Sequence, residues 1–317
     1  MKPRPPAKAL SRWRSFWSAA VLCRFGFVLL LTGSLGCRRT EPTVTAYASQ
    51  DQVYAEPILA DFTKQTGIRV KAIYDSEAVK TVGLVNRLIN EQSNPQCDVF
   101  WNNEELRTRQ LEARNIVAKW SPIGYRSRRI VINTNRVSVP PKSLIDLTNA
   151  TWRGKVALAY PLFGTTATHL LALRQQWGTN NWELWCRALQ SNKPFLVDGN
   201  SVVVQLVGRG EAALGLTDSD DIAAGQKEGM PIRALPLDAN SLLIPNTVAL
   251  IHRAPHPNEA QRLYEYLQSS AIRQALIAAS ALEGDTPPET AGIKVDWPRL
   301  LAEMEQGTAV LRRIFLR

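Results

Sequence analysis

The sequence predicts an α/β protein of two similar units, each a mostly parallel β-sheet flanked by helices. Between residues 43 and 111, short runs of β-forming residues alternate with segments of helical periodicity, which is typical of a parallel sheet covered on both faces. The Pro-rich segment at Pro140-Pro141 ends this first set. A second alternating set follows, and the chain beyond about residue 252 has mainly helical periodicity.

The first unit begins with the strand 43–48, in which β-forming residues alternate. Helical periodicity follows and ends at Thr66-Gly67. The next strands are 68–73 and 97–101, and each is followed by a further helix. Ligands of parallel sheets bind beyond the carboxyl ends of the strands. The polar residues after these strands are therefore candidate ligand contacts: Ser49, Asp51, Ser76 and Asn103.

The second unit is predicted to contain strands at 130–135, 155–159, 195–197 and 213–216, with helices at 166–177, 182–189 and 201–209. One more strand, 247–252, precedes a tail with helical periodicity at 259–267, 271–279 and 298–314. Insertion of one unit into the other explains this tail, because the short first unit then gains helices from the C-terminus. We predict a first lobe of 43–135 plus 249–317 and a second lobe of 136–248, with crossings near 133–139 and 245–250.

The charge balance is less informative than its total suggests. The 317 residues include 38 basic and 28 acidic side chains, a net charge of +10. Residues 1–36 carry six of the basic side chains and none of the acidic ones. The remainder is only mildly basic, which argues against a nucleic-acid partner. The basic run 126–129 precedes a predicted strand and is interpreted as a solvated face.

Residues 1–36 have the features of a secretory signal peptide. Basic residues precede the apolar run 25–31, which is far shorter than the roughly 20 residues that span a bilayer. Small residues then lead to Cys37, as at a bacterial lipoprotein cleavage site. We predict a periplasmic or cell-surface protein that meets the membrane only through a lipid on Cys37, with conventional cleavage and an uncleaved anchor as alternatives. Cys97 and Cys186 are predicted to be buried free thiols.

Two turns between a strand and a helix predict an anion site. Gly164, Thr165 and Thr166 precede one helix, and Asn200 and Ser201 precede another. Glycine permits close backbone approach, hydroxyls donate, and helix N-termini offer unpaired N–H groups to an anion. Both turns fall on the same edge of the predicted sheet. Simple helix capping is the alternative interpretation.

Carboxylates gather after the strand 213–216. Asp218, Asp220 and Asp221 repel one another unless they are solvated, cap a helix or bind a cation. The spacing is not that of an EF-hand. The three histidines show no metal-binding spacing, and no nucleophile, zinc-protease, P-loop or dinucleotide motif is present.

As a set, several segments resemble periplasmic substrate-binding proteins of the ferric-iron type. These are the segments 43–67, Asp98–Asn103, Pro161–His169 and Gly210–Leu216. The resemblance implies a type II periplasmic-binding-protein fold, with two α/β lobes, a two-strand hinge and a ligand cleft between the lobes. It also implies a monomer without enzyme activity or a cofactor, which delivers its ligand to the permease subunits of an ABC importer.

The ligand set of the ferric-binding family is not preserved. Those proteins commonly use a His after the first strand, a Glu after the third and a Tyr pair in the second lobe. Asp51 stands at the His place, Asn103 at the Glu place with Glu104 beside it, and Asp220-Asp221 at the Tyr pair. The leading hypothesis is ferric iron or another metal ion with a synergistic anion, with Asp51, Asp220 and Asp221 as metal ligands.

Three alternatives remain open from the sequence. The first is a phosphorylated or carboxylated organic solute whose amine or hydroxyl groups meet the Asp cluster. The second is a solute sensor that serves no permease. The most remote is an exported metal-dependent hydrolase.

Overall fold

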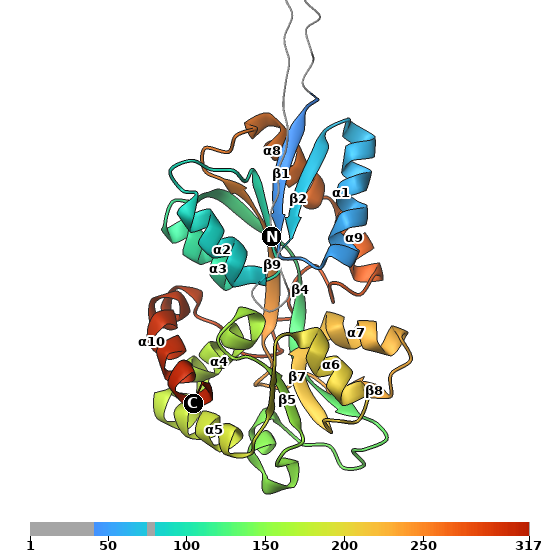
Figure 1. The fold of residues 1–317 in the computed structure, drawn as a ribbon, viewed down its shortest axis with the longest axis vertical. Coiled ribbons are helices and arrows are strands. Elements are labelled where there is room, and N and C mark those ends of the chain that lie inside the picture. Colours follow the sequence, from blue (N-terminus) through green and yellow to red (C-terminus); the bar gives the residue numbers. More distant parts are fainter. Residues whose placement is uncertain (1–40, 75–79, 317) are drawn as a thin grey trace, which may run out of the picture. The chain divides into compact units, whose positions relative to one another are not determined.

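The computed structural model describes residues 41–74 and 80–316, and residues 41–317 form one compact unit (Figure 1). The predicted signal at 1–36, the predicted anchor Cys37 and the candidate contact Ser76 lie outside the described residues. Among the described residues, no helix has both the length and the apolar character needed to cross a membrane.

One nine-stranded mixed sheet runs through the molecule in the order β2-β1-β3-β9-β4-β7-β5-β6, with β8 paired to β4. The pairs β1–β2, β1–β3, β5–β6 and β5–β7 are parallel, and every antiparallel pair includes β4 or β9. The strands are β1 (Thr43–Ala48), β2 (Arg69–Tyr74), β3 (Val99–Asn102), β4 (Val117–Asn133), β5 (Val156–Ala159), β6 (Phe195–Val197), β7 (Leu214–Asp218), β8 (Ile232–Ala234) and β9 (Leu243–Ile251).

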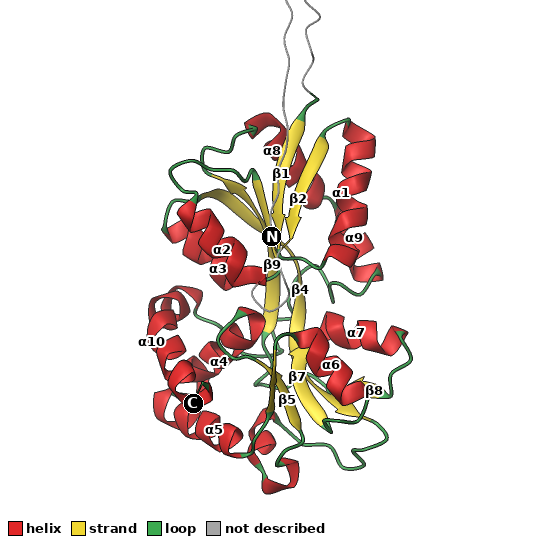
Figure 2. Ribbon diagram, in the orientation of Figure 1, coloured by secondary structure: helices red, strands yellow, loops and turns green. Residues whose placement is uncertain are grey.

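Two long strands are shared between the two lobes (Figure 2). β4 pairs with β9 as far as Ser127, and with β7 from Arg128 onward. The chain therefore changes lobes within β4, earlier than the segment 133–139 at which the sequence placed the crossing. We define lobe 1 as β1, β2, β3 and the ends of β4 and β9 that pair beside them. Lobe 2 consists of β5, β6, β7, β8 and the opposite ends of β4 and β9. The expected two-lobed α/β fold is confirmed.

Lobe 1 carries helices on both faces of its sheet. The helices are α1 (Gln52–Thr66), α2 (Lys80–Asn90), α3 (Glu105–Ala113), α8 (Pro257–Leu267) and α9 (Ser270–Ala278). Alternation along β1 divides the core: Val44 and Ala46 pack with Phe62 of α1 and Leu263 of α8, whereas Tyr47 packs on the other face.

Lobe 2 is built in the same way. Its helices are α4 (Gly164–Trp177), α5 (Thr179–Ser191), α6 (Asn200–Gly208), α7 (Ser219–Lys227) and α10 (Trp297–Phe315), with short 3-10 helices at Leu144–Thr148 and Ala150–Trp152. Ile130 and Ile132 face the core shared with α4 and α5, whereas Val131 faces α6. Cys97 and Cys186 are buried free thiols, as predicted, and lie in different lobes.

The C-terminal helix corrects the predicted lobe boundary. α8 and α9 pack in lobe 1, but Leu300 and Leu311 of α10 belong to the lobe 2 core with Leu171 of α4 and Trp182 of α5 (Figure 1). At Gly307 a Cβ atom would lie 2.3 Å from Leu171 Cδ2, so the two helices approach closely. Amphipathic periodicity predicts that a helix has a buried face, but it does not identify the lobe that covers that face.

Candidate functional site

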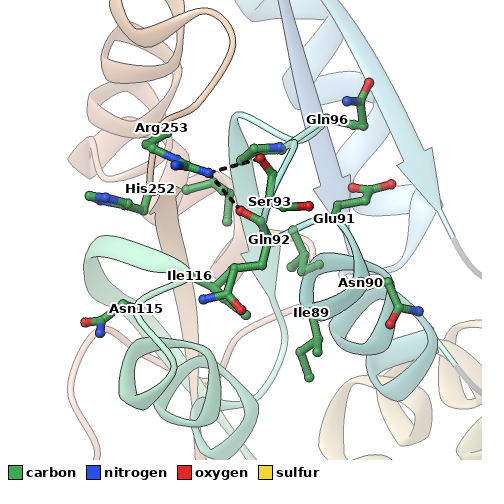
Figure 3. A pocket seen from close by; sticks show the side chains of 13 residues that line it. Ile89, Asn90, Glu91, Gln92, Ser93, Gln96, Asn115, Ile116, His252 and Arg253 are labelled. Carbon is green, nitrogen blue, oxygen red and sulfur yellow. Dashed lines mark hydrogen bonds between the residues drawn. The ribbon is translucent and has the colours of Figure 1, made fainter.

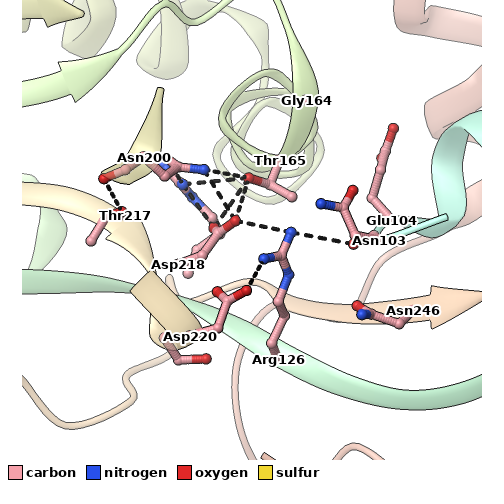
Figure 4. Close-up of polar contacts among 12 residues, drawn as sticks. Asn103, Glu104, Arg126, Gly164, Thr165, Asn200, Thr217, Asp218, Asp220 and Asn246 are labelled. Carbon is pink, nitrogen blue, oxygen red and sulfur yellow. Dashed lines mark hydrogen bonds and ion pairs between the residues drawn. The ribbon is translucent and has the colours of Figure 1, made fainter. Parts of the chain in front are cut away.

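A buried polar network joins the strand ends and helix N-termini of both lobes (Figure 4). Its centre is formed by two arginines of β4, Arg126 and Arg128, which are 3 % and 0 % exposed. Residues of a strand that are two apart lie on the same face, so both side chains lie on the face that α4 covers. Buried charges of this kind require ionic or hydrogen-bonded partners.

Arg128 is paired within lobe 2 through both of its terminal nitrogens. It lies opposite Asp218 in the β4–β7 register, and its Nη1 donates to Asp218 Oδ1 at 2.8 Å and to Asn200 Oδ1 at 2.7 Å. Nη2 donates to the carbonyl oxygen of Leu216 at 3.1 Å. The hydroxyl of Thr165 donates to Asp218 Oδ2 at 2.8 Å, so the turns before α4 and α6 meet at this ion pair.

Arg126 links the two lobes. Its Nη1 binds Asp220 Oδ2, its Nη2 lies 3.2 Å from Asp218 Oδ2, and Nη2 donates weakly to the carbonyl oxygen of Asn103 at 3.5 Å. Asn103 follows β3 in lobe 1, whereas Asp218 and Asp220 belong to lobe 2. Burial alone lowers the pKa of Arg126, but Asp220 and Asp218 outweigh that effect and raise it. The guanidinium is therefore a permanent positive charge at the junction of the lobes.

The lobe 1 side consists of neutral hydrogen-bonding groups and one buried acid. Ser49 donates to Asn102 Oδ1 at 2.8 Å and accepts from the backbone N–H of Asn103 at 3.0 Å. The hydroxyl of Thr168 in α4 donates to Glu104 Oε2 at 2.9 Å, a second direct bond between the lobes. Burial raises the pKa of Glu104, and Arg107, 3.8 Å away, only partly offsets it.

The carboxylates of the site outnumber its cations. Asp218, Asp220 and Asp221 each offer an oxygen, and these oxygens lie within 4.8 Å of one another. Burial raises the pKa of Asp220 to about 6 despite Arg126, and Asp218 and Asp51 add to the shift. Burial, followed by the charges of Asp220, Asp218 and Asp51, raises the pKa of Asp221 well above its ordinary value. Asp218 differs, because Arg126 and Arg128 outweigh burial and lower its pKa.

Asp51 brings a further carboxylate to this group from lobe 1. It is the N-cap residue of α1 but makes no capping hydrogen bond with its side chain. Its charge contributes to the raised pKa values of Asp220 and Asp221. The pKa of Tyr54, in the first turn of α1, is raised to about 12 by burial and then by Asp220, Asp51 and Asp221. The start of α1 therefore lies close to the Asp cluster.

The predicted site residues meet only in part through observed contacts. Ser49, Asn103, Thr165, Asn200 and Asp220 belong to the network described above. Gly164 opens α4 with a φ of +54°, a backbone conformation suited to glycine. Thr166 is buried and Ser201 half-buried in the first turns of α4 and α6. The ligand-binding and metal-binding roles of the whole set stay predictions.

The predicted solvated face at 126–129 is wrong. Three of its four residues, Arg126, Ser127 and Arg128, are at most 3 % exposed, and only Arg129, on the opposite face of β4 from the other two arginines, is partly exposed. The sequence predicts no strand between residues 101 and 130, because two register shifts, at 117–119 and 122–124, break the alternation of β4. Arg126 and Arg128 were therefore missed as site residues. The one signal in the sequence was that the two arginines are two residues apart, which places both side chains on the same face of a strand.

A separate hollow lies at the far end of lobe 1 (Figure 3). It has a volume of about 540 Å³ and is lined by residues of 88–96, Asn115, Ile116 and 251–253. Arg253 donates to the carbonyl oxygens of Gln92 at 3.2 Å and Ser93 at 3.1 Å. This hollow contains none of the predicted site residues, so it is not the predicted ligand site.

Comparison with known proteins supports the expected family. A model of bacterial extracellular solute-binding proteins matches residues 42–279. The major ferric iron-binding protein of Neisseria meningitidis is 24 % identical over 269 residues, which cover 75 % of this chain and 79 % of that protein. The Fe(3+)-binding periplasmic protein of Serratia marcescens is 26 % identical over 194 residues, covering 55 % and 56 % of the two chains.

Solved structures share the fold at low sequence identity. Iron-bound HitA from Pseudomonas aeruginosa superposes with a TM-score of 0.73 at 20 % identity, covering 86 % of this chain and 99 % of HitA. The periplasmic binding protein AfuA from Actinobacillus pleuropneumoniae, solved with fructose-6-phosphate, superposes with a TM-score of 0.74 at 15 % identity, covering 87 % and 99 %. The fold is therefore shared by proteins whose bound ligands differ.

Proposed function

This chain belongs to the bacterial extracellular solute-binding proteins, and we propose that it captures a metal cation, ferric iron in the first place, together with a small anion for import. Proteins of this family bind solutes without converting them, so the chain is not an enzyme and the hydrolase alternative is excluded. The observation that carries the proposal is the surplus of carboxylates over guanidinium groups at the junction of the lobes.

The cation subsite consists of Asp51, Asp220 and Asp221. Asp218 is already paired with two arginines, but Asp220 Oδ1 has no hydrogen-bond partner and Asp221 is only half-buried. Carboxylate oxygens are suitable ligands for a hard cation. Burial and, after it, mutual repulsion raise the pKa values of Asp220 and Asp221, and a cation among them would offset both effects.

The anion subsite lies beside it, at the start of α4 and α6. Neither helix has a side-chain cap on its N-terminus, and uncapped helix N-termini attract anions. Thr165 and Asn200 supply a hydroxyl and an amide, and Arg128 supplies a fixed positive charge beneath them. An anion held there would complete the coordination of a metal at the Asp cluster. The relatives from Neisseria and Serratia are named as ferric-binding proteins, which supports iron.

An organic solute is the second candidate, and the two arginines favour it. Arg126 is a permanent cation bonded to Asp220, one of the carboxylates that would bind a metal, and Arg128 is a second permanent cation bonded to the neighbouring Asp218. A solute that carries both an acid group and an amine or hydroxyl group would meet the same subsites without a concentrated positive charge. AfuA has the same fold and was solved with a sugar phosphate.

We further propose that the protein is exported, is tethered by a lipid on Cys37, and passes its ligand as a monomer to ABC permease subunits. A sensor without a permease remains the alternative. If the protein serves a permease, deletion of that permease should abolish ligand uptake by whole cells. A sensor predicts unchanged uptake.

Native mass spectrometry of the protein purified from its own periplasm tests the ligand directly. The metal proposal predicts a bound iron ion with a small anion, confirmed by elemental analysis of the same sample. A bound phosphorylated or carboxylated organic compound without iron would overturn the metal and establish the second candidate. Absence of any retained ligand after addition of ferric citrate and of fructose 6-phosphate would contradict both.

A further inference from the structure

The guanidinium of Arg126 is bonded to two members of a cluster of three carboxylates. The oxygens of Asp218, Asp220 and Asp221 come within 4.8 Å of one another, which is close enough to share a cation. Arg126 binds Asp220 with Nη1 and approaches Asp218 with Nη2 at 3.2 Å. One positive charge therefore already lies among the oxygens of this cluster.

This internal cation is held in place by the fold. Arg126 lies on β4 beyond the end of β7, two residues before the Arg128–Asp218 pair, so its side chain reaches both Asp218 and the first turn of α7. Its side chain is 3 % exposed, and those of Asp218 and Asp220 are each 1 % exposed. Arginine remains charged at all physiological pH values and cannot release its charge as lysine can.

The charge of Arg126 opposes any cation that enters the cluster. In a partly buried site, two positive charges a few ångströms apart repel strongly, and the repulsion rises with the charge of the entering ion. Arg128 adds a second positive charge on the far side of Asp218. An ion with a high charge therefore pays a larger penalty than an ammonium group or an ion that arrives with its own anion.

We propose that Arg126 is a specificity-determining residue, whose guanidinium fills part of the Asp218–Asp220–Asp221 cluster and weakens the binding of bare, highly charged metal ions. This inference deepens the proposed function, since it explains why a cation would need a companion anion at this site. It also holds if the natural ligand is an organic solute, in which case Arg126 excludes metals from the site.

The test measures binding of Tb³⁺ alone, a trivalent ion that prefers oxygen ligands, by its luminescence. In Arg126→Met the apparent affinity should rise at least about tenfold over the unaltered protein, because a neutral side chain no longer repels the ion. Arg126→Lys, which keeps the charge, should stay close to the unaltered protein. Arg129→Met is the matched control: it removes the same charge from the opposite face of the same strand and should change nothing.

The gain in Tb³⁺ affinity must depend on the carboxylates of the Asp218–Asp220–Asp221 cluster. Adding Asp220→Asn to Arg126→Met should abolish it. Equal or weaker Tb³⁺ binding by a folded Arg126→Met protein overturns the inference, and so does an equal gain in Arg129→Met. Arg126→Gln replaces Arg126→Met if circular dichroism shows that the methionine variant is unfolded. Iron bound to the unaltered protein is measured separately, so failure of the iron proposal leaves this comparison intact.

Discussion

Arg128 and Asp218 face each other across β4 and β7, and their side chains form a buried ion pair with 2.8 Å between Nη1 and Oδ1. Both side chains are at most 1 % exposed. Asn200 accepts a hydrogen bond from Arg128, and Thr165 donates one to Asp218. The ion pair therefore fixes the starts of α6 and α4 relative to the sheet. The position of the proposed anion subsite thus follows from one residue pair in one strand register.

Removing Arg128 should destabilise the protein strongly. Arg128→Met leaves the buried carboxylate of Asp218 with one guanidinium in place of two, and breaking a buried ion pair costs about 3–5 kcal/mol. Urea unfolding followed by circular dichroism measures this loss. Arg129→Met removes a partly exposed pair with Glu283 and should cost less than about 1 kcal/mol. Equal losses in the two variants would contradict a structural role for the Arg128–Asp218 pair.

Asp221 should act in ligand binding and contribute little to folding. It is half-buried, and burial together with the charges of Asp220, Asp218 and Asp51 raises its pKa. Asp221→Asn should therefore weaken binding of ferric citrate at least about tenfold while leaving stability unchanged or slightly higher. Isothermal titration calorimetry gives the affinity. Glu211→Gln, an equal charge change on the surface of lobe 2, is the control. Unchanged affinity in Asp221→Asn would remove this residue from the site.

Glu104 should make stability depend on pH. Burial raises its pKa above the ordinary value of about 4.3, so Glu104 binds a proton more tightly in the folded protein than in the unfolded chain. The contribution of Glu104 to stability is therefore full below its unfolded pKa and is lost as the pH rises through its folded pKa. Glu104→Gln keeps a neutral side chain at every pH. Urea unfolding between pH 4 and 8 should show the variant gaining stability relative to the unaltered protein as the pH rises, and a constant difference would contradict this.

Leu311 tests the position of the C-terminal helix. It is fully buried in the lobe 2 core, and truncation of a buried leucine to alanine costs about 2–5 kcal/mol. Leu311→Ala should lose this much in urea unfolding. Hydrogen exchange should show the loosened amides in α4 and α5. Leu184→Ala, at a position that is 66 % exposed, should have little effect. Loosening confined to α8 and α9 would instead place α10 in lobe 1.

The order of strands and helices could be predicted because most elements carry a clear period. β1 was placed at its observed bounds, and each parallel strand end was recognised as a place for ligand contacts. Residues that leave such ends are brought together by the topology of the sheet, whatever their distance in sequence. This is why Ser49 and Asn103, 54 residues apart, are hydrogen-bonded to each other.

The central arginines could not be predicted from the same signals. β4 contains Pro122 and Gly124 and two register shifts, so its alternation is interrupted before Arg126. Gly124 has a φ of +136°, and a Cβ atom there would lie 2.6 Å from Leu282 Cδ1 and 2.9 Å from the carbonyl oxygen of Gly284, long-range contacts that local periodicity does not reveal. The sequence pattern predicts an exposed Arg126 because it does not reveal the partners of this residue. Asp218 and Asp220 lie more than 90 residues away and are brought to Arg126 only by the β4–β7 register.

Anomalous diffraction at the iron edge tests the central claim most directly. Crystals of the protein grown with ferric citrate should show one strong anomalous peak within bonding distance of Asp220 and Asp221 oxygens, with citrate density at the N-termini of α4 and α6. The peak should vanish in Asp220→Asn/Asp221→Asn crystals. Iron bound elsewhere, or an iron-free site that holds an organic ligand from the cell, would contradict the proposed cargo.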